Sequence, residues 1–300
     1  MPDFLEGAYD LHVHSAPDVL PRKMDDLELA QRFKAVGMKG FCLKSHYFCT
    51  SERAALVNLV HPGFKATGSI VLNSAVGGLN PAAVEMAALS GAKIVWMPTC
   101  DSAYEQEHVF GGDHSAERKL PFWAKIVISL NEQGIRCPTI SLLDDRGELR
   151  EEVLEIIAII KRHDIALATG HISHKETFAL VKAAKEAGLN KLIITHVTFP
   201  TTFYTIDEQK ELVDLGAYME HCATTHLLNK VDFSTVVSQI KAIGPERVFL
   251  STDLGQPTNP YPDEGLRKFT EQLYLAGFSK SDIRMMVADN PLRLISADEE

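Results

Sequence analysis

The chain has 300 residues, of which 45% are hydrophobic and 23% are charged. This composition is typical of a globular protein with a large core, and it excludes collagen-like and disordered chains. A formal net charge of −10 argues against a nucleic-acid-binding protein, because such proteins carry a basic surface.

Eight short apolar segments recur along the chain. They are continuous rather than alternating, as expected of parallel strands that are buried on both faces. The predicted strands are 8–14, 40–44, 65–72, 93–97, 165–169, 191–195, 217–220 and 247–251.

Amphipathic segments lie between these strands and predict helices over 25–35, 81–89, 148–163, 175–187, 207–215, 233–243, 266–276 and 281–287. Asn80 followed by Pro81 is a helix start, because asparagine caps a helix and proline suits its first turn. Eight strands that alternate with helices predict a single-domain (β/α)8 TIM barrel over residues 1–300. A doubly wound open sheet is the alternative. It predicts a glycine-rich phosphate loop after the first strand, and the sequence has none there.

The segment 101–141 is longer than one strand-helix unit needs. Its first part, 102–115, is rich in glycine, histidine and acidic residues. We expect this part to be a long loop over the face of the barrel where the strands end.

Five scattered cysteines without a CxxC pair indicate reduced thiols rather than a disulfide scaffold. The first residues, MPDFLEGAYD, carry acidic side chains where a signal peptide would carry basic ones. Nowhere do about 18 apolar residues follow one another, as a membrane helix would need. We therefore expect a cytoplasmic protein that binds neither nucleic acid nor membrane.

Histidines follow the predicted strands. His12 and His14 end the first strand, His171 the fifth and His196 the sixth, while Asp253 ends the eighth. In a parallel barrel these strand ends converge on one face. A single strand-end histidine is commonly a hydrogen-bonding residue, but neutral imidazoles together with a carboxylate form a ligand set for Zn²⁺, Fe²⁺ or Mn²⁺.

Three further residues are candidates. His46 follows the second strand by two residues, and His221 lies at the end of the seventh; each is a candidate metal ligand. Lys44 ends the second strand within FCLKSH. A buried lysine beside a metal site is costly unless it is neutralised or paired.

These motifs resemble the amidohydrolase superfamily of metal-dependent hydrolases. The resemblance rests on HVH, ATGH, IITH and STD at the strand ends and on the C-terminal ADNPLRLI. DLHVHSAPD, NSAVGGLNPAAVE, AKIVWMPT and STDLGQ are similar to an uncharacterised branch of amidohydrolase-like proteins.

The resemblance implies a site with one or two divalent ions, zinc first, with manganese or iron as alternatives. His12, His14, His171 and His196 would bind the metal, and Asp253 would bind it and accept a proton from water. Members with two ions usually carry a bridging lysine carbamate or glutamate on the fourth strand, where Lys93 lies at the wrong end. Lys44 is then either carbamylated or a substrate-binding residue, and a salt bridge to a neighbouring carboxylate is the structural alternative.

The function that follows is a metal-dependent hydrolase acting on an amide, lactone or ester of a small molecule. One alternative is a phosphoesterase of the polymerase-and-histidinol-phosphatase type, with His46 and His221 as extra ligands and Lys44, Arg22 or Lys23 holding phosphate. The other is a barrel that binds a metal or small molecule without turnover. By base rate we expect a homo-oligomer.

Overall fold

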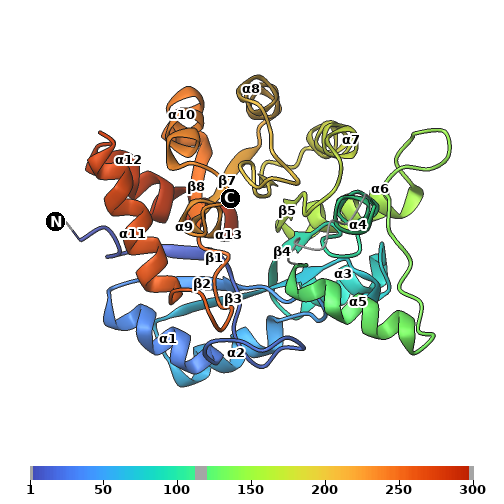
Figure 1. Ribbon diagram of the computed structural model, residues 1–300, viewed down its shortest axis with the longest axis horizontal. Helices are drawn as coiled ribbons and strands as arrows, with labels where there is room; N and C mark the ends of the chain where they lie inside the picture. The colour runs from blue at the N-terminus through green and yellow to red at the C-terminus, as the bar shows by residue number, and fades with distance from the viewer. Residues whose placement is uncertain (1–2, 112–119, 297–300) are drawn as a thin grey trace.

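The computed structural model describes residues 3–111 and 120–296 and shows a single sheet of eight parallel strands in the order β1 to β8 (Figure 1). The strands are β1 (Tyr9–Val13), β2 (Gly40–Leu43), β3 (Lys65–Val71), β4 (Ala92–Trp96), β5 (Ala166–Ala168), β6 (Leu192–Ile194), β7 (Tyr218–Cys222) and β8 (Val248–Ser251). The predicted (β/α)8 barrel is thus confirmed.

The ends of β1 and β8 close the barrel. Val13 forms a parallel bridge with Leu254. The backbone N–H of Asp253 donates to the carbonyl of His12 at 2.7 Å, and that of His14 donates to the carbonyl of Leu254 at 2.8 Å. These bonds join the strand that carries the HVH motif directly to the segment that carries the aspartate.

The helices surround the strands (Figure 1). They are α1 (Asp26–Ala35), α2 (Ser51–Val60), α3 (Pro81–Leu89), α4 (Ala103–Phe110), α5 (Phe122–Glu132), α6 (Glu151–His163), α7 (His174–Glu186), α8 (Ile206–Asp214), α9 (Ala223–Leu227), α10 (Phe233–Ile243), α11 (Pro262–Leu275), α12 (Lys280–Arg284) and α13 (Asn290–Ile295). The 3-10 helices η1 (Ser74–Val76) and η2 (Pro245–Arg247) and the π-helical turn η3 (Met285–Asp289) complete the set. Within the described ranges, no helix combines the length and apolar composition that crossing a membrane requires.

Local sequence determines where several helices begin. The Asn80 side chain accepts the backbone N–H of Ala83 and so caps α3, with Pro81 in the first turn as predicted. Ser173 and Glu176 form a reciprocal capping box at the start of α7. The start of α7 lies directly after His171, so the cap also anchors the loop that carries this histidine.

The loop predicted over 102–115 is wrong in its first part, because residues 103–110 form α4; residues 112–115 lie outside the described part of the chain. The sequence pattern does not predict this helix, because one of the two residues that α4 buries is charged. Its inner face carries Glu105 and Val109, one turn apart, so a carboxylate occupies a position where a helical pattern needs an apolar residue. The following helix, α5, lies in a stretch to which the sequence assigned no element.

Two apolar layers hold the barrel together. Inside it, large side chains of Tyr9, Leu11, Trp96 and Phe249 pack with small ones such as Ala168, as dense packing of a barrel interior requires. A second layer fills the space between the strands and the helices. Because the barrel interior is filled, polar side chains that point inward gather beyond it, at the strand ends.

Candidate metal centre

The ends of β1 and β8 bring two histidines to one carboxylate. Asp253 Oδ1 lies 3.2 Å from His12 Nε2 and 3.1 Å from His14 Nε2. Both imidazoles are buried. These three residues each offer one ligand atom, and the atoms lie within 4.8 Å of one another.

The opposite ring nitrogens of both histidines are held by acceptors. His12 Nδ1 lies 3.0 Å from Glu220 Oε1, and His14 Nδ1 lies 2.8 Å from the carbonyl oxygen of Lys44. A carbonyl or carboxylate oxygen accepts, so the tautomer with the hydrogen on Nδ1 satisfies these two contacts and leaves the Nε2 lone pair for a metal ion. This is the arrangement by which proteins orient imidazoles toward a metal ion.

His196 at the end of β6 faces the same carboxylate, with Nε2 3.9 Å from Asp253 Oδ2. Its ring centroid lies 4.9 Å from that of His12. His196 and Asp253 both have left-handed backbone conformations, with φ of 54° and 53°. Such conformations cost non-glycine residues free energy and concentrate at functional sites. Two strand ends therefore hold strained residues that point at one focus.

His171 at the end of β5 completes the histidine set. Its ring centroid lies 5.2 Å from that of His196. Neither ring nitrogen of His171 has a hydrogen-bond partner among the described residues, although the ring is buried. Its closest acidic neighbour is Glu105 of α4, whose Oε2 lies 3.6 Å from His171 Nδ1.

The electrostatics of the cluster favour neutral His14 and His196 beside an ionised carboxylate, whereas the carboxylates of Glu220 and Asp253 raise the pKa of His12 against the effects of burial and of Lys44. Burial by itself raises the pKa of Asp253, but the facing histidines hold it well below its usual range. Burial lowers the pKa of His14 to about 3, with nearby Arg22 contributing, and lowers that of His196 well below its ordinary value. A neutral imidazole is the form that binds metal ions.

Lys44 is buried at the centre of this cluster. Its Nζ lies 2.9 Å from His12 Nε2 and 4.4 Å from the centre of the Trp96 ring. Burial lowers the pKa of Lys44. The His12 nitrogen that faces Asp253 is thus also the nitrogen that the lysine contacts, so a metal ion and the ammonium group would compete for it.

His46 lies beside the cluster rather than within it. Its ring stacks on that of His14, with centroids 5.3 Å apart. Its Nδ1 lies 2.8 Å from the hydroxyl of Thr99, and burial lowers its pKa well below the ordinary value.

The structure does not bring His221 to the cluster. Side chains alternate along a strand, and in β7 the inward residues are Tyr218, Glu220 and Cys222. His221 between them points to the helix side. Burial lowers its pKa to about 3, with His226 contributing.

Three polar residues near the histidines were not predicted. Glu220 and Cys222 form a group with His12 and His196 in which one ligand atom of each lies within 4.8 Å of the others, and Glu105 approaches from α4. The alternation of side chains along a strand could have identified Glu220 as an inward residue. The prediction instead ended the seventh strand at Glu220 and took the next residue, His221, as the candidate ligand. No local signal marks Glu105.

The residues fit a divalent ion. Four imidazoles and a carboxylate converge, and this donor set is the one that zinc, manganese and iron prefer. The buried nitrogens of His171, and Nδ1 of His196, have no partner among the described residues. Buried polar atoms without partners are uncommon unless a ligand, ion or water satisfies them.

Comparisons with known protein sequences give a family match. A family model described as "Family of unknown function (DUF6282)" matches residues 7–220. No curated protein sequence matches the chain.

Three solved structures are similar to the chain. An amidohydrolase from Pseudomonas aeruginosa has a TM-score of 0.63 at 12% identity, covering 98% of this chain and 96% of that one. The lactonase Lmo2620 from Listeria monocytogenes has a TM-score of 0.55 at 12% identity, covering 98% and 97%. A phosphotriesterase homology protein from Escherichia coli, complexed with phosphate in its active site, has a TM-score of 0.58 at 14% identity, covering 99% and 100%. These similarities, at 12% to 14% identity, support the (β/α)8 barrel fold.

Proposed function

Since the chain belongs to the family of unknown function DUF6282, its chemistry has to be inferred from its site, and we propose that it is a metal-dependent hydrolase. One observation carries this proposal: the Nε2 atoms of His12, His14 and His196 all face the Asp253 carboxylate, at 3.2, 3.1 and 3.9 Å. The substrate we propose is a small molecule with an amide, lactone or ester bond. Solved structures of similar fold include enzymes named as an amidohydrolase and a lactonase.

The proposed cofactor is one or two divalent ions, zinc first, with manganese or iron as alternatives. His12, His14, His171, His196 and Asp253 would hold it. When bound, such an ion lowers the pKa of a coordinated water toward about 7 and polarises a carbonyl group.

Asp253 is the proposed general base. Its pKa lies well below the usual range, so at neutral pH it is ionised and can accept a proton from the attacking water. The same carboxylate can then deliver this proton to the leaving group. His14 and His196 do not compete for the proton, because burial keeps their pKa values low.

Lys44 is the proposed substrate-binding residue. Its Nζ contacts His12 Nε2 and lies over the face of the Trp96 ring. A buried ammonium group in this position can donate to the substrate oxygen on which negative charge develops. A carbamylated Lys44 that bridges two ions is the alternative, and the metal count distinguishes the two.

A phosphoesterase is the second candidate, favoured by one observation. Arg22 Nη2 lies 3.2 Å from His14 Nδ1, so a guanidinium group that suits phosphate is present beside the cluster. Its pairing with Asp18 at 2.6 Å already satisfies this charge, which ranks the phosphoesterase second. In that case His46 would be the extra ligand, because His221 lies on the helix side of β7.

The test is the metal content of protein purified without chelator, measured by plasma mass spectrometry. We expect one or two equivalents in the wild type and none in the His12→Ala, His14→Ala double variant, with circular dichroism showing a folded barrel. The His108→Ala variant, in an exposed residue of α4, is the control and should keep its metal. Full metal content in the double variant would overturn the assignment.

Activity then separates the candidates. Metal-loaded protein should hydrolyse an aryl ester in preference to the matching aryl phosphate, and three bound ions with the reverse preference would favour the phosphoesterase. Binding of metal without turnover of any substrate would leave the non-catalytic alternative.

The cytoplasmic location and the homo-oligomer stay predictions. Cell fractionation would test the first, and light scattering would test the second.

A further inference from the structure

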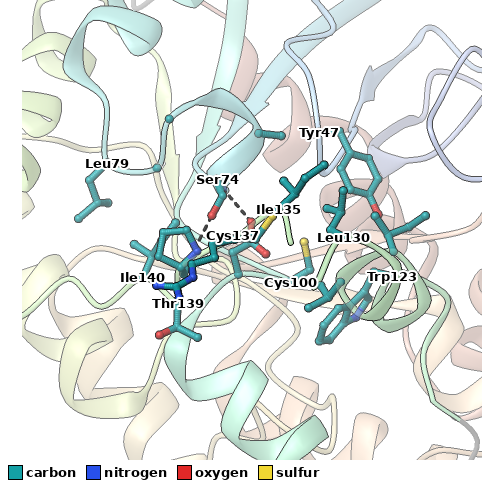
Figure 2. A pocket seen from close by; sticks show the side chains of 18 of the residues that line it. Tyr47, Ser74, Leu79, Cys100, Trp123, Leu130, Ile135, Cys137, Thr139 and Ile140 are labelled. Atoms are coloured by element: carbon teal, nitrogen blue, oxygen red, sulfur yellow. Dashed lines mark hydrogen bonds between the residues drawn. The ribbon is translucent and has the colours of Figure 1, made fainter. Parts of the chain in front are cut away.

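A cavity of about 690 Å³ lies between the loops after β2, β3 and β4 and the segment that joins β4 to β5 (Figure 2). It is bounded by the loop after β3, by Cys100 and Asp101 after β4, and by α5 with the residues that follow it. This volume lies within the range of small-molecule sites in proteins. The cavity is built entirely from described residues.

The walls are mainly apolar. Trp123 and Val127 line it from α5, and Ile135 and Ile140 line it from the segment after that helix. Trp123 and Val127 belong to a small core cluster separate from the barrel core. Ile135 is 51% exposed, so apolar surface is left uncovered within the cavity. An open apolar wall of this kind is typical of a site that an apolar group fills.

A single hydroxyl group points into the apolar part. Figure 2 shows Tyr47 reaching toward Leu130 and Trp123. The Tyr47 hydroxyl is buried and has no hydrogen-bond partner among the described residues. An unsatisfied buried hydroxyl is uncommon, and in this position it can orient a ligand by one hydrogen bond.

Contacts of His46 and Asn73 connect the lining of the cavity to the histidine cluster. Tyr47 follows His46, whose ring stacks on that of His14. Asn73 links the two sides, because its Nδ2 donates to the carbonyl of His46 at 3.0 Å and to Cys100 Sγ at 3.2 Å. A ligand in the cavity is therefore adjacent to the residues that face the metal centre.

We propose that this cavity binds an uncharged apolar group, either an aromatic ring or a medium-length alkyl chain. Its role as the site for the acyl group of the substrate rests on the proposed hydrolase function. The charges of the lining favour an uncharged group, because two basic residues, Arg136 and Arg150, and two acidic ones, Asp101 and Glu152, leave it without net charge.

The test uses adjacent residues of α5. Val127 lines the cavity and is 7% exposed, whereas Ile128 does not line it and is 37% exposed. Val127→Trp fills the cavity, and Ile128→Trp is the matched control on the outer face of the same helix. Ile135→Trp fills the cavity from a residue outside the packed cluster, and it replaces Val127→Trp if that variant does not fold.

Binding is measured without catalysis, by calorimetric titration with 1-naphthol. We expect the wild type and Ile128→Trp to bind it equally, and the cavity-filling variants to bind at least about tenfold more weakly, as the loss of a few buried methylene-sized contacts implies. Equal binding by all four proteins would overturn the proposal.

Substrate selectivity gives the second readout. We expect the wild type to prefer p-nitrophenyl hexanoate over the acetate by about tenfold in kcat/KM, because an apolar chain gains from burial, and Val127→Trp to lose this preference while keeping its rate on the acetate. An unchanged preference in that variant would overturn the acyl-group role. If no ester, lactone or amide is turned over, the hydrolase proposal fails, while selective loss of naphthol binding still supports the cavity as a ligand site.

Discussion

Glu105 and His171 face each other across the boundary between α4 and the barrel, with Glu105 Oε2 3.6 Å from His171 Nδ1. Both side chains are buried, and neither atom has a hydrogen-bond partner among the described residues. Burial raises the pKa of Glu105, but His171, Thr201 and His108 together lower it to below the ordinary value. An ionised carboxylate behind an imidazole holds the ring in one orientation and strengthens it as a ligand.

Glu105→Gln should therefore weaken metal binding by about 10- to 100-fold, the usual cost of losing an orienting carboxylate. The measurement is a competition titration with a chromophoric chelator. Glu107→Gln removes an exposed carboxylate from the same helix and should leave the affinity unchanged. Equal affinities of the two variants would show that Glu105 does not orient His171.

Replacement of Lys44 should separate metal binding from turnover. We expect Lys44→Met to keep at least one equivalent of metal, because the ammonium group that contacts His12 Nε2 is removed and no longer competes for that nitrogen. The rate should fall by about 10²- to 10³-fold, the typical effect of deleting one donor to a developing negative charge.

Plasma mass spectrometry and steady-state kinetics measure the two effects. Lys65→Met, at the start of β3 and so at the opposite end of the strands, is the control and should keep both metal and rate. Loss of metal from Lys44→Met, restored by neither zinc nor manganese, would instead favour a lysine that has become a ligand as a carbamate.

The strand pattern predicted most of this site, because a parallel barrel places every strand end on one face. His12, His14, His196 and Asp253 meet there for that reason alone. It is harder to predict which side chains of a strand point into the barrel than to predict where the strand lies, since a shift of one residue reverses the two faces. The predicted seventh strand ended at Glu220, whereas β7 continues to Cys222.

Contacts between distant segments could not be predicted. Glu105 lies 66 residues before His171 in the chain and on a helix that buries a carboxylate, so neither hydrophobic periodicity nor spacing distinguishes it from a surface residue. The cavity beside α5 likewise depends on how that helix packs against the loop after β3, which no local pattern encodes.

His221 should make the protein less stable in mild acid. Its pKa falls from an ordinary value of 6.5 to about 3 on folding, so below pH 6.5 the unfolded chain binds a proton that the folded chain does not. Stability is therefore complete above pH 6.5 and declines as the pH falls toward 3. Between pH 7 and pH 5 this one group should cost about 2 kcal/mol.

His221→Leu should remove that part of the pH dependence. The measurement is urea unfolding at pH 7 and pH 5 with a chelator present, so that metal release does not contribute. Without chelator the variant should bind as much metal as the wild type, because this side chain lies on the helix side of β7. An unchanged pH dependence would mean that folding does not lower the pKa of this imidazole, and loss of metal would make His221 a ligand.

Gly170 should be required for the position of His171. Its φ is +63°, and a Cβ atom there would lie 2.2 Å from the backbone oxygen of Met97 and 2.6 Å from that of Pro98. Since these are backbone atoms of the segment after β4, they cannot move aside as the end of a side chain can. Gly170→Ala should therefore displace the loop that carries His171 and weaken metal binding by at least about tenfold, comparable with the loss of an orienting contact.

Gly188→Ala is the matched control for this change. Gly188 also has a positive φ, of +80°, but a Cβ atom there meets only the end of the Lys161 side chain, at 3.7 Å. Both alanines bear the strain of a left-handed backbone, about 1 kcal/mol, and only Gly170→Ala adds a clash. Both variants should thus lose thermal stability, whereas chelator competition should show weaker metal binding in Gly170→Ala alone. The same loss of affinity in both would attribute the effect to general destabilisation rather than to the placement of His171.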